Sequence, residues 1–151
     1  MSKVAKVFVI HGPNLGLLGE RKPEIYGKYT LDDINSELEF LAKQADIEID
    51  FLQSDSEGEI VSKVGQAKNK YDVIIINPAG YTHTSIAIRD AVEAAGIDTI
   101  EVHLSNIYNR EEFRNKSLIA PVCVGQVSGF GKNSYVLAFQ AALEIIKSAS
   151  L

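Results

Sequence analysis

Short apolar segments alternate along the chain with longer segments in which apolar residues recur at helical spacing. The short segments have the length and composition of β-strands, and the longer ones have the period of amphipathic helices. No repeat, low-complexity tract or Pro/Ser-rich linker interrupts this alternation. The pattern predicts strands over residues 4–10, 47–51, 73–76, 99–103 and 121–127.

Two of these strands differ in how polar residues are distributed. Residues 73–76 are β-branched throughout (Val-Ile-Ile-Ile), which is typical of a strand covered on both faces and therefore central. In residues 47–51, apolar residues alternate with Glu48 and Asp50. That alternation leaves one face in water, so this strand is expected at an edge of the sheet.

The predicted helices carry recognisable start and stop signals. Thr30 with Asp33 forms a capping-box-like start, and apolar residues follow at helical spacing as far as Ala45. Ser56 with Glu59 begins the next helix in the same way. Further helices are expected over residues 85–95, ended by Gly96 in a left-handed cap, and over 133–148, with a short helical turn at 110–114.

Five strands separated mainly by helices indicate an α/β fold with one parallel sheet. Right-handed crossovers place helices on both faces of such a sheet, which gives a three-layer sandwich. Because the second strand is expected at an edge, the flavodoxin-like order 2-1-3-4-5 is the simplest arrangement. A chain of 151 residues is the size of one domain, so residues 1–151 are expected to form a single domain.

Composition narrows the function classes. Fifteen basic and twenty acidic residues give a net charge of −5, which makes nucleic acid an unexpected partner. The single cysteine excludes an internal disulfide framework and fits a reducing compartment. The first apolar run is too short for a signal-peptide core or a membrane span. A cytoplasmic protein without a membrane partner is therefore expected.

Polar residues gather where three predicted strands end. The first strand runs into residues 11–14 (His-Gly-Pro-Asn), the third into residues 77–83, and the fourth into residues 101–106. All three histidines of the chain, His11, His83 and His103, lie at these ends. Ligands of open α/β sheets bind beyond the carboxyl ends of the strands, so a functional site is expected there. A single histidine in such a place would more often be structural.

The connection from Gly12 to Tyr29 is longer than the usual βα loop and is expected to act as a lid. It contains Arg21 and Tyr26. A phenol, whose reference pKa is about 10, is a poor base at neutral pH unless a cation stabilises the phenolate. Arg21 and Tyr26 therefore form a candidate base, although a solvated arginine and a packed tyrosine are the commoner outcome in a surface loop.

His103 is the candidate acid. Glu101 lies two residues earlier on the same face of the strand and could orient the imidazole ring. A base and an acid together suit elimination, in which a proton is removed beside a carbonyl and a hydroxyl leaves. Asn14 and Asn77 could stabilise the enolate oxygen. Alone, Glu101 would be interpreted as an exposed edge residue and Asn77 as a turn former before Pro78.

An anion could bind after the fourth strand. Ser105 and the backbone amides that follow it, with the helical turn near Asn109, could form a nest for a carboxylate. Arg110 and Arg114 are four residues apart and would share one face of that turn. They either point together toward a polar or anionic ligand or pair at the surface with the adjacent glutamates.

Other functions fit the fold class. For a nucleotide- or flavin-binding module, residues 129–134 approach G-x-G-x-x-G, but they end in serine and follow the fifth strand instead of the first. A metal hydrolase could use His11, His83, His103 and Glu101, but the sequence contains no H-E-x-x-H motif. A non-catalytic oligomeric binding protein would use the same residues without turnover.

The motifs resemble those of one family. Residues 11–27 (HGPNLGLLGERKPEIYG) resemble the opening motif GPNLNLLGxREPxxYG of the type II 3-dehydroquinate dehydratases. Residues 77–85 (NPAGYTHTS) with Arg89 and Asp90, residues 101–106 (EVHLSN) with 110–114 (REEFR), and residues 126–131 (QVSGFG) resemble the remaining blocks. The likeness covers nearly the whole chain, in order and without evident insertion.

The resemblance implies a flavodoxin-like fold and the dehydration of 3-dehydroquinate to 3-dehydroshikimate through an enolate, with no metal, Schiff base or other cofactor. By position, Tyr26 would be the base, Arg21 would stabilise its phenolate, and His103, held by Glu101, would protonate the leaving hydroxyl. Asn14 would help to stabilise the enolate. The implied substrate-binding residues are Asn77, His83, Leu104, Ser105 and Arg114.

The family also suggests an assembly. Asp90 would contribute near the site of an adjoining subunit, and the usual oligomer is a dodecamer built as a tetramer of trimers. Two residues depart from the opening motif, Gly16 where Asn is typical and Lys22 where Glu is typical. Neither replaces a proposed proton-transfer group, so they bear on how the loop moves more than on the chemistry.

Overall fold

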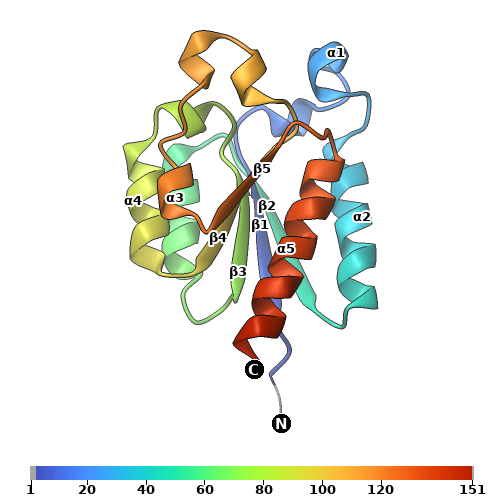
Figure 1. Ribbon diagram of the computed structural model, residues 1–151, viewed down its shortest axis with the longest axis vertical. Helices are drawn as coiled ribbons and strands as arrows, with labels where there is room; N and C mark the ends of the chain where they lie inside the picture. The colour runs from blue at the N-terminus through green and yellow to red at the C-terminus, as the bar shows by residue number, and fades with distance from the viewer. Residues whose placement is uncertain (1–2, 151) are drawn as a thin grey trace.

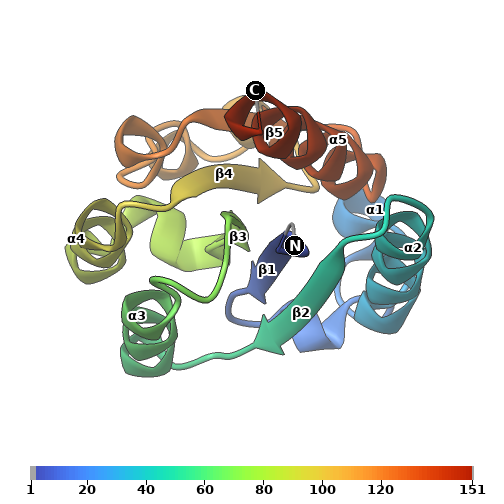
Figure 2. The ribbon, with the colours of Figure 1, turned by 90° about the horizontal axis from the view of Figure 1, so that it is seen from below.

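The computed structural model describes residues 3–150. Five parallel strands form one sheet in the order β2-β1-β3-β4-β5, with helices on both faces (Figures 1 and 2). The predicted flavodoxin-like three-layer sandwich and its strand order are confirmed. The strands are β1 (Lys6–His11), β2 (Glu48–Gln53), β3 (Val73–Asn77), β4 (Asp98–His103) and β5 (Gly125–Ser128).

Each face of the sheet carries its own apolar core because successive residues of a strand point to opposite sides. Val7, Val9, Val73 and Ile75 face α2 and α5, and the residues between them face α3 and α4. Figure 2 shows these two pairs of helices on opposite sides of the sheet. Every residue of β3 is buried, whereas no residue of β2 is, as expected for a central strand and an edge strand.

The helices begin and end close to the predicted signals. Thr30 and Asp33 form a complete capping box, and the Ser56 and Ser85 side chains cap the next two helices. Gly96 ends the third of them in the left-handed conformation, with φ of 65°. The α-helices are α1 (Pro23–Tyr26), α2 (Leu31–Gln44), α3 (Glu57–Gln66), α4 (Ile86–Ala95) and α5 (Asn133–Ala149).

Two predicted segments differ from the structure. The strand expected from residue 121 begins at Gly125, because Ala120–Val122 form a 3₁₀ helix with Pro121 in its first turn, where a missing N–H is tolerated. The turn expected at 110–114 is a 3₁₀ helix over Glu112–Arg114 only, and a second 3₁₀ helix, Ile107–Asn109, precedes it. The 3₁₀ helices are η1 (Leu15–Leu17), η2 (Ala79–His83), η3 (Ile107–Asn109), η4 (Glu112–Arg114) and η5 (Ala120–Val122). Within residues 3–150, no helix has the length and apolar character needed to cross a membrane.

His11 belongs to the core, so the expectation that all three histidines meet at one site is wrong for this residue. It has the same orientation as Val7 and Val9, which directs its ring toward α2 and α5. The ring is fully buried and contacts Asn35 and Tyr135 through its two nitrogens, at 2.8 and 2.9 Å. His11 does not line the cavity described below.

Burial of His11 predicts sensitivity to acid. Desolvation lowers the pKa of His11 to about 4, even though its hydrogen bond with Asn35 acts in the opposite direction. Between the ordinary pKa of about 6.5 and about 4, the unfolded chain binds a proton that the folded chain does not. The free energy of unfolding therefore decreases as the pH is lowered through this window, and at pH 4.5 the loss from this group is about 2–3 kcal/mol.

Urea unfolding at pH 7.5 and pH 4.5 checks this expectation. Other groups also titrate in this range, so the informative quantity is the difference between the wild type and His11→Gln, which cannot be protonated there. The wild type should lose about 2–3 kcal/mol more stability than the variant between the two pH values. Equal losses in the two proteins would show that His11 does not contribute to the acid sensitivity.

Candidate active site

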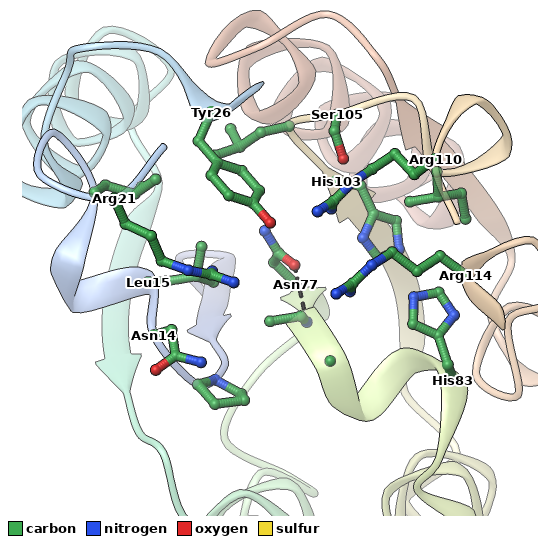
Figure 3. A pocket seen from close by; sticks show the side chains of 16 residues that line it. Asn14, Leu15, Arg21, Tyr26, Asn77, His83, His103, Ser105, Arg110 and Arg114 are labelled. Atoms are coloured by element: carbon green, nitrogen blue, oxygen red, sulfur yellow. Dashed lines mark hydrogen bonds between the residues drawn. The ribbon is translucent and has the colours of Figure 1, made fainter. Parts of the chain in front are cut away.

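A cavity opens beyond the carboxyl ends of β1, β3 and β4, beside the point where the strand order reverses (Figure 3). The space in it that is open to the centres of water-sized molecules is about 160 Å³. Three segments supply the lining residues: the loop after β1 (Pro13, Asn14, Leu15, Leu18, Arg21, Tyr26), the turn after β3 (Asn77, Ala79, Gly80, His83), and the segment after β4 (His103, Leu104, Ser105, Ile107, Arg110, Arg114).

Tyr26 lies between two guanidinium groups. Arg21 Cζ is 5.0 Å from the centre of its ring and Arg110 Cζ is 5.2 Å away, and the hydroxyl points into the cavity (Figure 3). The short helix α1 carries Tyr26, and it begins after Lys22 in a left-handed conformation, with φ of 41°. Two positively charged groups therefore pack against the Tyr26 ring. The pairing with Arg21 was expected from the sequence, whereas the contact with Arg110 was not.

The two arginines after β4 were expected either to face a ligand or to pair with the adjacent glutamates, and they do both. Arg110 and Arg114 line the cavity together, and both guanidinium groups also face Glu111, with Nε to Oε1 distances of 3.7 and 3.1 Å. Arg21, Arg110 and Arg114 therefore all border one space. Among the described residues that line this space there is no carboxylate. The cavity thus carries positive charge and suits an anionic ligand.

His103 and Glu101 form the expected pair. The Nε2 atom of His103 is 2.8 Å from Glu101 Oε2, which leaves Nδ1 to exchange a proton with a molecule in the cavity. Glu101 is fully buried, so the interpretation as an exposed edge residue is wrong. Burial alone would raise the pKa of Glu101, but hydrogen bonds from His103, Ser117 and Gln126 outweigh it and hold the pKa below its ordinary value.

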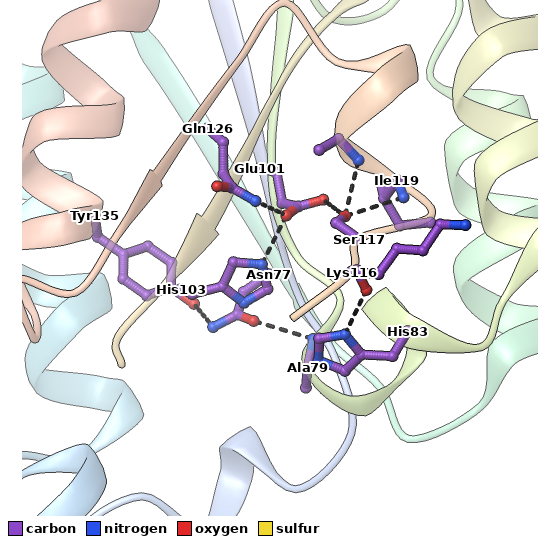
Figure 4. A network of polar contacts seen from close by, with 11 residues as sticks. Asn77, Ala79, His83, Glu101, His103, Lys116, Ser117, Ile119, Gln126 and Tyr135 are labelled. Atoms are coloured by element: carbon purple, nitrogen blue, oxygen red, sulfur yellow. Dashed lines mark hydrogen bonds and ion pairs between the residues drawn. The ribbon is translucent and has the colours of Figure 1, made fainter. Parts of the chain in front are cut away.

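Two residues that support Glu101 were missed in the sequence. Ser117 Oγ donates to Glu101 Oε1 at 2.7 Å, and Gln126 Nε2 donates to Oε2 (Figure 4). Gln126 is the register partner of Glu101 on β5, so it would have been found had the start of that strand been known. Nothing local in the sequence indicates Ser117, which reaches Glu101 from the loop before η5. A buried carboxylate does, however, require such donors.

His83 presents one nitrogen to the cavity. Its Nδ1 donates to the Lys116 backbone oxygen at 2.8 Å, which leaves Nε2 free toward the lining (Figure 4). Desolvation lowers the pKa of His83 and outweighs the hydrogen bond to Lys116, which acts in the opposite direction. His83 is therefore neutral at pH 7, and its Nε2 is a hydrogen-bond acceptor.

Asn14 and Asn77 both line the cavity, as expected. Asn14 has a φ of 68°, and its backbone N–H donates to Asp55 Oδ1 at 2.9 Å. Asn77 is buried at the end of β3, and its Oδ1 accepts from the Ala79 N–H at 3.0 Å. Gly12 allows this arrangement, because a Cβ at that position would lie 2.8 Å from the Asn77 backbone oxygen.

Of the remaining candidate binding residues, some line the cavity and one does not. Leu104 and Ser105 line the cavity, whereas Asp90 is exposed on α4 and does not. Within residues 3–150, no group of His, Cys, Asp or Glu side chains is arranged to hold a metal ion. The four-residue metal set considered above is not assembled, because His11 lies in the core. The glycine-rich segment at 129–134 does not contribute to the cavity either.

Comparison with known proteins matches the sequence of this chain to one family. A family model described as dehydroquinase class II matches residues 5–143. The chain belongs to the class II dehydroquinase family. The resemblance seen in its motifs is thereby confirmed.

Members of the class II dehydroquinase family resemble this chain along nearly its whole length. A 3-dehydroquinate dehydratase of Geotalea daltonii is 56% identical over 142 residues, 94% of this chain and 99% of that protein. One of Francisella philomiragia is 57% identical over 140 residues, 93% of this chain and 95% of that protein.

Two crystal structures of type II dehydroquinases share the fold. That from Butyrivibrio crossotus has a TM-score of 0.91 at 42% identity, and that from Propionibacterium acnes has a TM-score of 0.88 at 37% identity. In both comparisons, the match covers 93% of this chain and 98% of the other.

Proposed function

We propose that this chain, as a single catalytic domain, dehydrates 3-dehydroquinate to 3-dehydroshikimate through an enolate intermediate, without a metal or a Schiff base. Its membership of the class II dehydroquinase family supports the overall reaction. The observation that supports the mechanism is that a phenol and an imidazole line one cavity, Tyr26 beside two guanidinium groups and His103 hydrogen-bonded to a buried carboxylate.

The first step removes a proton from the carbon next to the ketone. The Tyr26 phenolate, stabilised by Arg21 and Arg110, accepts this proton, and the electron pair moves into the enolate. Asn14 helps to stabilise the enolate oxygen, either directly or through a water molecule. The loop that carries Arg21 and Tyr26 closes over the substrate and excludes bulk water.

The second step expels the hydroxyl on the far side of the new double bond. His103 donates a proton to this hydroxyl, so that water leaves and the enolate collapses to a conjugated enone. The buried carboxylate of Glu101 orients the ring and places negative charge beside it. The cycle ends with Tyr26 protonated and His103 deprotonated, and proton exchange with solvent restores both groups.

Substrate binding is assigned to the remaining lining residues. The substrate carboxylate faces Arg114 and the backbone amides of the Leu104–Ser105 segment, where the positive charge of the cavity favours it. Asn77 and His83 hydrogen-bond the substrate hydroxyls. Asp90 lies outside the cavity of its own chain, so its contribution would reach the site of an adjoining subunit. We expect a homo-oligomer, a dodecamer built as a tetramer of trimers.

The reaction belongs to the shikimate pathway, which leads to chorismate and the aromatic amino acids, and it also serves quinate breakdown. We expect the enzyme to act in the cytoplasm. Because the product is a conjugated enone, adding the purified protein to 3-dehydroquinate should raise the ultraviolet absorbance. The absence of any rise at high enzyme concentration, with or without added metal, would exclude this function.

Borohydride distinguishes the proposed mechanism from one that uses a lysine imine. Treatment in the presence of substrate should leave activity unchanged, because no lysine lines the cavity among the described residues. A chelator should have no effect either. Substrate-dependent inactivation by borohydride would contradict the mechanism while leaving the overall reaction intact.

A further inference from the structure

A chain of buried hydrogen bonds that the chemistry above does not use begins at Asn77. Asn77 Nδ2 is 3.2 Å from the Tyr135 hydroxyl on α5, and this hydroxyl is 2.9 Å from His11 Nδ1 (Figure 4 shows the first contact). His11 Nε2 in turn lies 2.8 Å from Asn35 Oδ1 on α2. The chain thus links a residue that lines the cavity to α5 and α2, the two helices on one face of the sheet.

The donor and the acceptor of each bond follow from the chemistry of the partners. The Ala79 backbone N–H can only donate, so the Asn77 atom facing it is Oδ1, and Nδ2 faces Tyr135. Because the Tyr135 oxygen accepts from Nδ2, its own proton goes to His11 Nδ1. The proton of the neutral ring is then on Nε2, where Asn35 Oδ1 accepts it.

The setting leaves these groups no other partners in the described residues. Tyr135 and His11 are fully buried, and Asn77 is nearly so. His11 and Asn77 are register partners on the adjacent strands β1 and β3, and they face the same side of the sheet, where Tyr135 lies between them. Breaking one bond would leave a buried polar group unpaired, which is costly. The amide plane of Asn77 is thereby fixed.

We infer that Tyr135 and His11 are positioning residues. They hold the Asn77 amide in one orientation, so that the second N–H of Nδ2 is directed at the bound substrate. This inference rests on the proposed function, in which Asn77 binds the substrate. Neither Tyr135 nor His11 lines the cavity, so both act through Asn77.

A double-mutant cycle tests this role. Tyr135→Phe removes only the hydroxyl and keeps the ring in the core. It should lower kcat/KM about tenfold, mainly by raising KM, because the substrate meets a misoriented amide. In an Asn77→Ala background, the same change should lower kcat/KM less than about twofold, because the group through which it acts is gone. His11→Phe should behave in the same way.

Tyr71→Phe is the matched control. The Tyr71 hydroxyl donates to Asp50 at 2.7 Å at the opposite end of the sheet from the cavity, so its loss should leave kcat and KM unchanged. All variants are compared below their unfolding temperatures. Equal falls in kcat/KM in the wild-type and Asn77→Ala backgrounds, or no fall in the wild-type background, would overturn the inference.

A crystal structure separates failure of this inference from failure of the proposed function. In Tyr135→Phe, the Asn77 amide should be rotated or displaced relative to the wild type, whether or not the protein turns over 3-dehydroquinate. An amide in the same orientation in both crystals would overturn the inference. An inactive wild type with a displaced amide in the variant would instead reject the function and retain the positioning role.

Discussion

Tyr26→Phe is expected to lower kcat about 10³-fold, within the range of about 10²–10⁴ typical of a lost general base. The phenylalanine ring can keep the contacts with Arg21 and Arg110, so the local structure and substrate binding should persist. KM should therefore change no more than about threefold. The variant thus removes the proton acceptor and leaves the positive charges around it.

The enone absorbance gives kcat and KM for this variant, and calorimetric titration with substrate gives its binding. Tyr108→Phe is the control, because Tyr108 is exposed and does not line the cavity. It should keep full activity. If Tyr26→Phe also keeps full activity, the base is another group, and the neutral His83 becomes the next candidate. If Tyr26→Phe loses binding as well as turnover, Tyr26 acts in substrate binding.

The sequence predicts the fold well because its signals are local. Capping at Thr30, Ser56 and Ser85 depends on residues only three positions away. The positions of β3 at the centre and β2 at the edge of the sheet follow from the absence of polar residues over 73–76 in the first and their alternation in the second. The start of β5 was predicted too early because Pro121 and the apolar residues after it have the composition of a strand, whereas residues 120–122 form a 3₁₀ helix before the strand begins.

The site is less predictable because its contacts join distant segments. The alignment of Glu101 with His103 follows from the two-residue period of a strand. The approach of Arg110 to Tyr26 and of Ser117 to Glu101 depends on how separate loops fold over the sheet. The burial of His11, by contrast, could have been predicted from local sequence. Its side chain points to the same face of β1 as those of Val7 and Val9, which lie in the core.

His103→Ala should lower kcat by about 10²–10³-fold, because the departing hydroxyl then has no acid to protonate it. Glu101 would still accept hydrogen bonds from Ser117 and Gln126, so its carboxylate would remain partly satisfied and the fold should persist. The lost ring leaves a space beside that carboxylate. Added imidazole should enter this space and restore kcat about tenfold or more, by supplying the missing proton donor.

His83→Ala is the matched variant for this experiment. Both histidines line the cavity, but His83 donates to a backbone oxygen and has no carboxylate on its ring. Its loss should raise KM more than it lowers kcat, and imidazole should not restore activity, because a binding group is missing and not an acid. If imidazole rescues His83→Ala and not His103→Ala, the proton donor is His83. In that case Nε2 of His83 must carry the proton that the leaving hydroxyl takes, and His103, held by the buried Glu101, acts in substrate binding.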